Sequence, residues 1–220
     1  AACAIVAAGA FPALGQPPTA YNFEVLHDNP RFYWNFNETG TANAVDVVRQ
    51  QTNDELASVG GATRGASLSA NLGNTAVFNG ANAFATAALG DYEMPGSWAI
   101  ALWAKADGSL AGSRADYLPN AGGPNANAGG NNPGVIFDFT TDNSVGLFSG
   151  AGRTDNQSGT PLISDNNWHH YVCTFYGNGT FGSADRVDIA VDGVLSTVPR
   201  GGFSAGFALN NALVVGSAFA

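Results

Sequence analysis

The stretch that decides the fold is RVDIAVDGVLST, residues 186–197. Its odd-numbered positions 187 to 191 are Val, Ile and Val, which places them on one side of an extended chain, with Asp188 and Ala190 on the other, solvated side. Such period-two alternation is typical of a half-buried strand. Asp192-Gly193 is a favoured two-residue hairpin turn, so the chain is predicted to turn back into a second antiparallel strand.

Similar short apolar runs recur on either side of this stretch, separated by turn residues. We predict further strands at residues 32–36, 75–78, 98–104, 135–139, 144–148, 170–176 and 211–216. Residues 135–139 and 144–148 are predicted to pair with each other. Helix signals are weak and short, and they fall at residues 20–28 and 46–56. Many short strands with Gly and Asn turns favour an all-β sandwich or barrel.

Residues 107–134 depart from this rhythm and are rich in Gly, Asn and Pro. They are predicted to form a long loop, which is either a surface insertion or a binding loop. Tyr92 and Tyr117 fall in predicted loops and are the candidate ligand-binding residues. The four tryptophans fall on predicted strands or strand entries and are expected to pack in the core. They are Trp34, Trp98, Trp103 and Trp168.

The charge balance excludes several classes of partner. The 220-residue chain has a net charge of −9, and Lys105 is its single lysine. Nucleic acids and anionic membranes are bound mainly through clustered Lys and Arg, so neither is expected here. The apolar residues 1–14 are shorter than the ~20 residues of a membrane helix and contain Pro12, so no membrane insertion is predicted. Soluble cations and neutral polymers are the favoured partners.

Cysteine and histidine positions give little indication of chemistry. Cys3 and Cys173 do not form a disulfide framework. Cys173 lies within an apolar run and is predicted to be buried. The spacing does not decide whether Cys3 and Cys173 form a disulfide. His169 and His170 are neighbours on a predicted strand, point to opposite faces and cannot share one metal ion. Three sequons, at Asn37, Asn156 and Asn178, are glycan acceptors only in an organism that glycosylates secreted chains.

Three segments in order resemble the laminin G-like, concanavalin A-like lectin/glucanase superfamily. They are DNPRFYWNFNE (28–38), AVFNG (76–80) with SWAIALWAK (97–105), and NWHHYVCTFYG (167–177) with VDIAVDG (187–193). The resemblance implies two antiparallel sheets packed face to face in a jelly roll. We assign residues 20–220 to this sandwich and residues 1–19 to an apolar extension. The superfamily includes lectins, adhesion modules, hydrolases and structural domains, so the fold does not choose a function.

The chain departs from the superfamily pattern at its end. Members usually finish with one more strand, whereas this sequence stops at residues 216–220, where that strand would begin. A missing strand leaves backbone groups unpaired. The apolar segment containing Ile5, Val6 and Phe11 is predicted to fill this position in a neighbouring copy, which gives a homo-oligomer by strand donation. A trimmed end, or filling of the position by the same chain, are the alternatives.

No catalytic residue is predicted. Resembling hydrolases carry two catalytic carboxylates in an E-x-D-x-x-E pattern, which none of the four glutamates here matches. Loops rich in Asp and Asn make calcium a candidate cofactor, but no fixed spacing defines a ligand set. The loop positions in question are Asp46, Asp138, Asp142, Asn143 and residues 165–167.

Three functions therefore follow from the sequence, in this order. The first is a non-catalytic extracellular or cell-surface module with a structural role, such as a self-associating subunit of a filament or shell. The second is a lectin-like adhesion module that binds a glycan or a protein. The third is a glycan hydrolase.

Overall fold

The computed structural model shows a chain built of short antiparallel strands and one short helix. It describes residues 20–40, 42–50, 55–59, 62–69, 73–78, 83–88, 97–105, 115–119, 135–139, 145–149, 152–155, 166–177, 183–204, 212–215 and 217–218. The elements are α1 (Ala20–His27), β1 (Ala57–Val59), β2 (Thr63–Ser69), β3 (Gly73–Val77), β4 (Ala83–Ala88), β5 (Trp98–Lys105), β6 (Ala115–Pro119), β7 (Val135–Phe139), β8 (Val145–Ser149), β9 (Gly152–Asp155), β10 (Trp168–Gly177), β11 (Ser183–Val191), β12 (Val194–Ser204), β13 (Ala212–Val215) and β14 (Ser217–Ala218).

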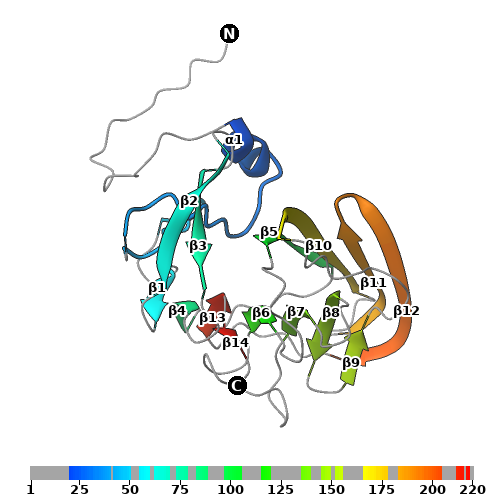
Figure 1. Cartoon of the computed structure of the whole chain (residues 1–220). Helices are drawn as coiled ribbons and strands as arrows, with labels where there is room; N and C mark the ends of the chain where they lie inside the picture. Colours follow the sequence, from blue (N-terminus) through cyan, green and yellow to red (C-terminus); the bar gives the residue numbers. More distant parts are fainter. Residues whose placement is uncertain are drawn as a thin grey trace.

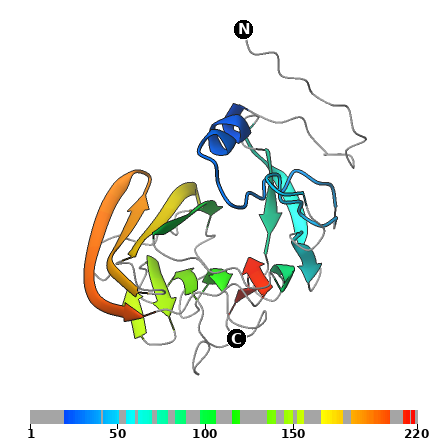
Figure 2. The same ribbon diagram turned by 180° about the vertical axis from the view of Figure 1, so that it is seen from behind.

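The strands form an all-β sandwich, as the sequence predicts. One sheet has the order β12-β11-β10-β5. The others have the orders β1-β4-β13 and β14-β6-β7-β8-β9, together with the β2-β3 hairpin. Figure 1 and Figure 2 show α1 and the β2-β3 hairpin on one side of the molecule, with β10, β11 and β12 on the other.

The strands at the centre of the prediction form as expected. Val191 pairs with Val194 across the two-residue turn. Asp192 and Gly193 adopt φ values of 50° and 78°, which is the left-handed backbone that such hairpins require. The predicted pair of strands is also confirmed, since Phe137 of β7 faces Leu147 of β8.

The predicted strand at residues 32–36 is wrong. This segment makes one isolated bridge, between Trp34 and Asp46. Phe36 has a φ of 54°, which interrupts an extended chain. A short helix, α1, does form within residues 20–28. The other weak helix, at residues 46–56, does not form in the described residues, where Ala44 and Leu56 instead bridge in an extended arrangement.

β13 and β14 pair with strands that lie far earlier in the sequence. Val214 of β13 pairs with Ala85 of β4, and Ser217 of β14 pairs with Asp116 of β6. β13 and β14 therefore lie between β4 and β6, as Figure 1 shows. These pairings do not test strand donation by the apolar segment of residues 1–19, which stays a prediction.

Among the described residues, two groups of apolar side chains are buried. On the four-stranded sheet, Tyr171, Cys173 and Ile189 are almost fully buried. Burial raises the pKa of the free Cys173 thiol to about 12, so it packs as a small apolar group. The second cluster consists of Ala44, Leu56 and Ala62, and the residues packed against it are Trp34, Phe36, Ala76, Phe78 and Val215.

Candidate binding face

The four-stranded sheet has a second face, opposite to the buried one, that carries a mixture of aromatic, polar and small side chains. The strand register places Val172 beside Ala101 and Ala190, and Thr174 beside Ala99 and Asp188. We call this surface the outer face. It consists of Ala99, Ala101, Trp103 and Lys105 of β5, His170, Val172, Thr174 and Tyr176 of β10, and Arg186, Asp188 and Ala190 of β11. The four β5 residues are exposed.

An aromatic pair marks one end of the outer face. The rings of Trp103 and His170 have centroids 5.0 Å apart and are tilted by 33°. Trp103 Nε1 donates a hydrogen bond of 3.2 Å to the hydroxyl of Tyr21 in α1. Trp103 is nevertheless 37% exposed, so its predicted place in the core was wrong. The outward direction follows from its parity on β5, which it shares with the exposed Lys105.

Three side chains form the other end of the outer face. The Arg186 guanidinium carbon lies 4.0 Å from the centroid of the Tyr176 ring. Arg186 Nη2 also donates a hydrogen bond of 2.8 Å to Asp188 Oδ2. The Asp188 side chain is only 5% exposed, whereas that of Arg186 is 47% exposed. Asp188 does lie opposite to Ile189, as predicted, but its expected solvation was wrong.

The two ends are separated along β10. His170 and Tyr176 are six residues apart on one strand, which corresponds to about 20 Å at the rise of an extended chain. Between them the register places Ala99, Ala101, Val172, Thr174, Asp188 and Ala190, with Leu195 of β12 beside Ala190. An extended ligand could therefore contact aromatic rings at both ends.

Hydrogen bonds join the turn between β11 and β12 to the start of β10, beside the outer face. Asp192 Oδ2 lies 2.6 Å from His169 Nδ1, and Asp192 Oδ1 accepts a hydrogen bond of 2.9 Å from the His170 amide. The hydrogen bond with His169, followed by that from the His170 amide, lowers the pKa of Asp192. His169 and His170 point to opposite sides of β10, as predicted. The ring of His170 contacts Trp103, whereas the ring of His169 is bonded to Asp192.

The burial of His170 makes stability depend on pH. Burial lowers the pKa of His170 below its ordinary value of 6.5, against the weaker opposing effect of Asp192. The unfolded chain therefore protonates His170 more readily than the folded chain does. The folded state is stabilised above pH 6.5, and this stabilisation is lost as the pH falls below 6.5 toward the lowered pKa of the folded chain. We expect the urea midpoint to drop between about pH 7.5 and about pH 5.5, and to drop less in His170→Phe, which keeps a ring on Trp103. Equal pH profiles for the two proteins would contradict this assignment.

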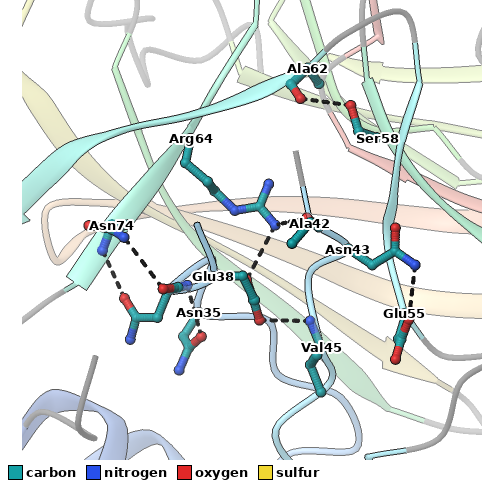
Figure 3. A network of polar contacts seen from close by, with 11 residues as sticks. Asn35, Glu38, Ala42, Asn43, Val45, Glu55, Ser58, Ala62, Arg64 and Asn74 are labelled. Carbon is teal, nitrogen blue, oxygen red and sulfur yellow. Dashed lines mark hydrogen bonds and ion pairs between the residues drawn. The ribbon is translucent and has the colours of Figure 1, made fainter. Parts of the chain in front are cut away.

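A separate polar network is buried between the segment at residues 35–45 and the β2-β3 hairpin (Figure 3). Arg64 Nη2 lies 3.2 Å from Glu38 Oε2, and these side chains are 4% and 7% exposed. Asn37 Oδ1 accepts a hydrogen bond of 2.8 Å from the Asn74 amide. Asn37 is 1% exposed, so this sequon is no glycan acceptor in the folded chain. The network links the segment of Asn37 and Glu38 to the β2-β3 hairpin.

The candidate calcium positions that fall within the described residues are not gathered into a site. Among the described residues, no group of three or more His, Cys, Asp or Glu side chains could hold a metal ion. Asp46 is fully buried and its carboxylate accepts hydrogen bonds from the amides of Tyr33, Val48 and Arg49. Asp138 lies in β7 rather than in a loop. Asp142, Asn143 and Asp165 lie outside the described residues.

The residues named from the sequence have mixed outcomes. Tyr117 lies in β6, so its placement in a loop was wrong, because pairing with β7 and β14 orders a segment that has no strand pattern of its own. Its role as a ligand contact is untested. Tyr92, the extension with Ile5, Val6 and Phe11, Cys3, and the sequons Asn156 and Asn178 lie outside the described residues. In the described part of the chain, the helix is too short to cross a membrane.

The outer face itself was missed by the sequence analysis. The signal was present in β5, where Ala99, Ala101, Trp103 and Lys105 share one parity. A lysine at the end of an otherwise small-residue row indicates that the row faces solvent. Trp103 was therefore identifiable as an outward-facing aromatic residue.

The geometry defines the class as an antiparallel β-sandwich, and comparison with known proteins supports the same class. No family model and no curated protein sequence matches the chain. Three chains of solved structures do match. One is domain 4 of AbnA, a GH43 extracellular arabinanase from Geobacillus stearothermophilus, in complex with arabinotriose. The TM-score is 0.54 with 14% identity, over 83% of this chain and 85% of that one, which shows a shared fold.

Proposed function

We propose that this chain is a non-catalytic module that binds a neutral glycan outside the cell through the outer face. The observation that carries the proposal is the row of Trp103 with His170 at one end and Tyr176 with Arg186 at the other. Exposed aromatic rings provide apolar contact area with polar edges, and the planar side chains beside them can exchange hydrogen bonds with hydroxyl groups.

The charge of the molecule supports a neutral ligand. The chain carries −9, so polyanionic glycans meet a repulsive field. On the outer face the Asp188 carboxylate is bonded to Arg186, which leaves Lys105 as the remaining full charge among the residues that define it. The similar arabinanase domain, which was solved with arabinotriose, supports the same class of ligand.

The extracellular location and the superfamily belong to this proposal. We infer a laminin G-like, concanavalin A-like jelly roll from the three sequence segments and the sandwich architecture. The similar domain belongs to an extracellular enzyme, which supports secretion of this chain. The non-catalytic assignment rests on the engagement of Asp188 by Arg186 at a face where hydrolysis would use two free carboxylates.

The structural or assembly role now ranks second. It depends on strand donation by residues 1–19, which lie outside the described residues. Homo-oligomerisation through the segment of Ile5, Val6 and Phe11 stays an untested prediction. Glycan binding ranks first because described side chains support it directly.

Affinity electrophoresis in gels containing neutral polysaccharides tests this function. We expect at least one polysaccharide to retard the wild-type chain. The affinity of Trp103→Ala for that polysaccharide should be lower by about tenfold or more. Phe23→Ala is the matched control, because Phe23 is an aromatic residue of α1 that is 63% exposed and lies off the outer face. Circular dichroism of each variant verifies folding. Wild-type mobility that no polysaccharide changes, or equal retardation of Trp103→Ala, would refute the proposal.

A further inference from the structure

The carboxylate of Asp188 has a hydrogen-bonding capacity that the fold does not use. Its Oδ2 accepts from Arg186, but its Oδ1 is buried and has no hydrogen-bond partner among the residues that the structure describes. The side chain is 5% exposed. A buried carboxylate oxygen without a partner is costly, and native structures keep few of them. This oxygen therefore points to a function.

The neighbours of Asp188 form a small recognition unit. Thr174 is its partner in the register on β10, and its hydroxyl can both donate and accept hydrogen bonds. Tyr176 and Arg186 form the next row of the same face, with the guanidinium against the phenol ring. The unit combines an unused acceptor, a cluster of N–H donors and an aromatic ring within two rows of the sheet.

We propose that Asp188 and Arg186 together bind two adjacent hydroxyl groups of one sugar, with Tyr176 in contact with the sugar ring. This inference rests on the glycan-binding function and names its ligand class, a neutral saccharide with free vicinal hydroxyls. Each hydroxyl of such a pair is both donor and acceptor. One therefore donates to Asp188 Oδ1, while the other accepts from an Arg186 N–H.

Arg186 controls access to this subsite. Asp188 Oδ1 is shielded from solvent, whereas the Arg186 side chain is 47% exposed and extends along the same face from two residues away. A partly exposed arginine has open space into which it can rotate. Its rotation would break its hydrogen bond to Asp188 Oδ2 and expose the face of the Tyr176 ring against which it lies, while its other donors stay available to a bound sugar.

Two independent experiments test the inference on a polysaccharide that retards the wild-type chain. In the first, Asp188→Asn keeps the shape of the side chain but replaces one acceptor oxygen by a donor. We expect its affinity for the polysaccharide to be lower by about tenfold or more. Asp28→Asn is the matched control, since it removes the same charge from an exposed residue away from the face, and it should bind like the wild type.

The second experiment changes the ligand and leaves the protein intact, so it does not depend on the folding of a variant. Periodate cleaves the carbon–carbon bond between vicinal hydroxyls, and borohydride then reduces the resulting aldehydes. We expect the treated polysaccharide to lose wild-type binding, while the same polymer exposed to spent periodate keeps it. Binding should also be unchanged in EDTA.

The outcomes separate the two proposals. No binding by the wild-type chain refutes the glycan-binding function. Binding that is weakened by Trp103→Ala but not by Asp188→Asn, or that persists on the periodate-treated polymer, overturns the Asp188 subsite alone. Loss of binding in EDTA with recovery in calcium would place a cation on the carboxylate, and would likewise overturn the subsite.

Discussion

Replacing Glu38 by glutamine is expected to lower the free energy of unfolding by about 3–5 kcal/mol. Glu38 Oε1 accepts a hydrogen bond of 2.8 Å from the Val45 amide, while Oε2 lies 3.2 Å from Arg64 Nη2. A glutamine can satisfy one of these donors, but its NH₂ group then faces the other. The Arg64 guanidinium would stay buried without its counter-ion.

The cost is large because Arg64 is held in an unfavourable environment. Burial lowers the pKa of Arg64, and the charge and hydrogen bond of Glu38 offset part of this effect. Arg64 also donates a hydrogen bond of 2.9 Å to the Ala42 carbonyl, and the Phe36 ring lies 5.2 Å from its guanidinium carbon. Neither supplies a negative charge.

Urea denaturation measures this loss, and Glu55→Gln is its control. Glu55 accepts a hydrogen bond of 2.9 Å from Asn43 at an exposed position, so this second variant should change stability by less than about 0.5 kcal/mol. If Glu38→Gln unfolds at the wild-type midpoint, the buried ion pair does not exist in solution.

Asp46→Asn is expected to cost about 2–4 kcal/mol. Asp46 is fully buried, and its Oδ1 accepts from the Tyr33 and Val48 amides at 2.8 and 3.2 Å. Its Oδ2 accepts from the Arg49 amide at 3.2 Å. Asparagine keeps one oxygen and turns an NH₂ group toward the remaining amide, so two buried donors face each other.

Thermal and urea unfolding compare this variant with Gln50→Asn. Gln50 is exposed and has a φ of 54°, a backbone that asparagine tolerates well, so the control should be neutral or slightly stabilising. Stability of Asp46→Asn within about 0.5 kcal/mol of the wild type would show that these backbone amides find other partners.

The sequence predicts the parts of this fold in which local and global preferences agree. The β11-β12 hairpin follows from alternation and from Asp192-Gly193, and the parity of β10 separates His169 from His170. Residues 32–36 have the composition of a strand, yet the Tyr33 amide bonds to the Asp46 carboxylate and no ladder forms. A side chain distant in sequence decides this local structure, and alternation cannot reveal it.

The candidate site was predictable in part. The faces of β5, β10 and β11 follow from period two, which places Asp188 opposite to Ile189. That Asp188 is buried depends on the register with β10 and on the position of Arg186, and neither is encoded in the pattern of one strand. Residues 115–119 form β6 only because β7 and β14 lie beside them.

The place of β13 and β14 between β4 and β6 has a consequence for the order of folding. The strands β10, β11 and β12 are neighbours in one sheet and are close in sequence. They can therefore pair as soon as this part of the chain leaves the ribosome. The layer containing β4 and β6 waits for a segment made more than a hundred residues later than β4. Until then two strand edges are open to other nascent chains, and synthesis rate or chaperones would influence how much protein matures.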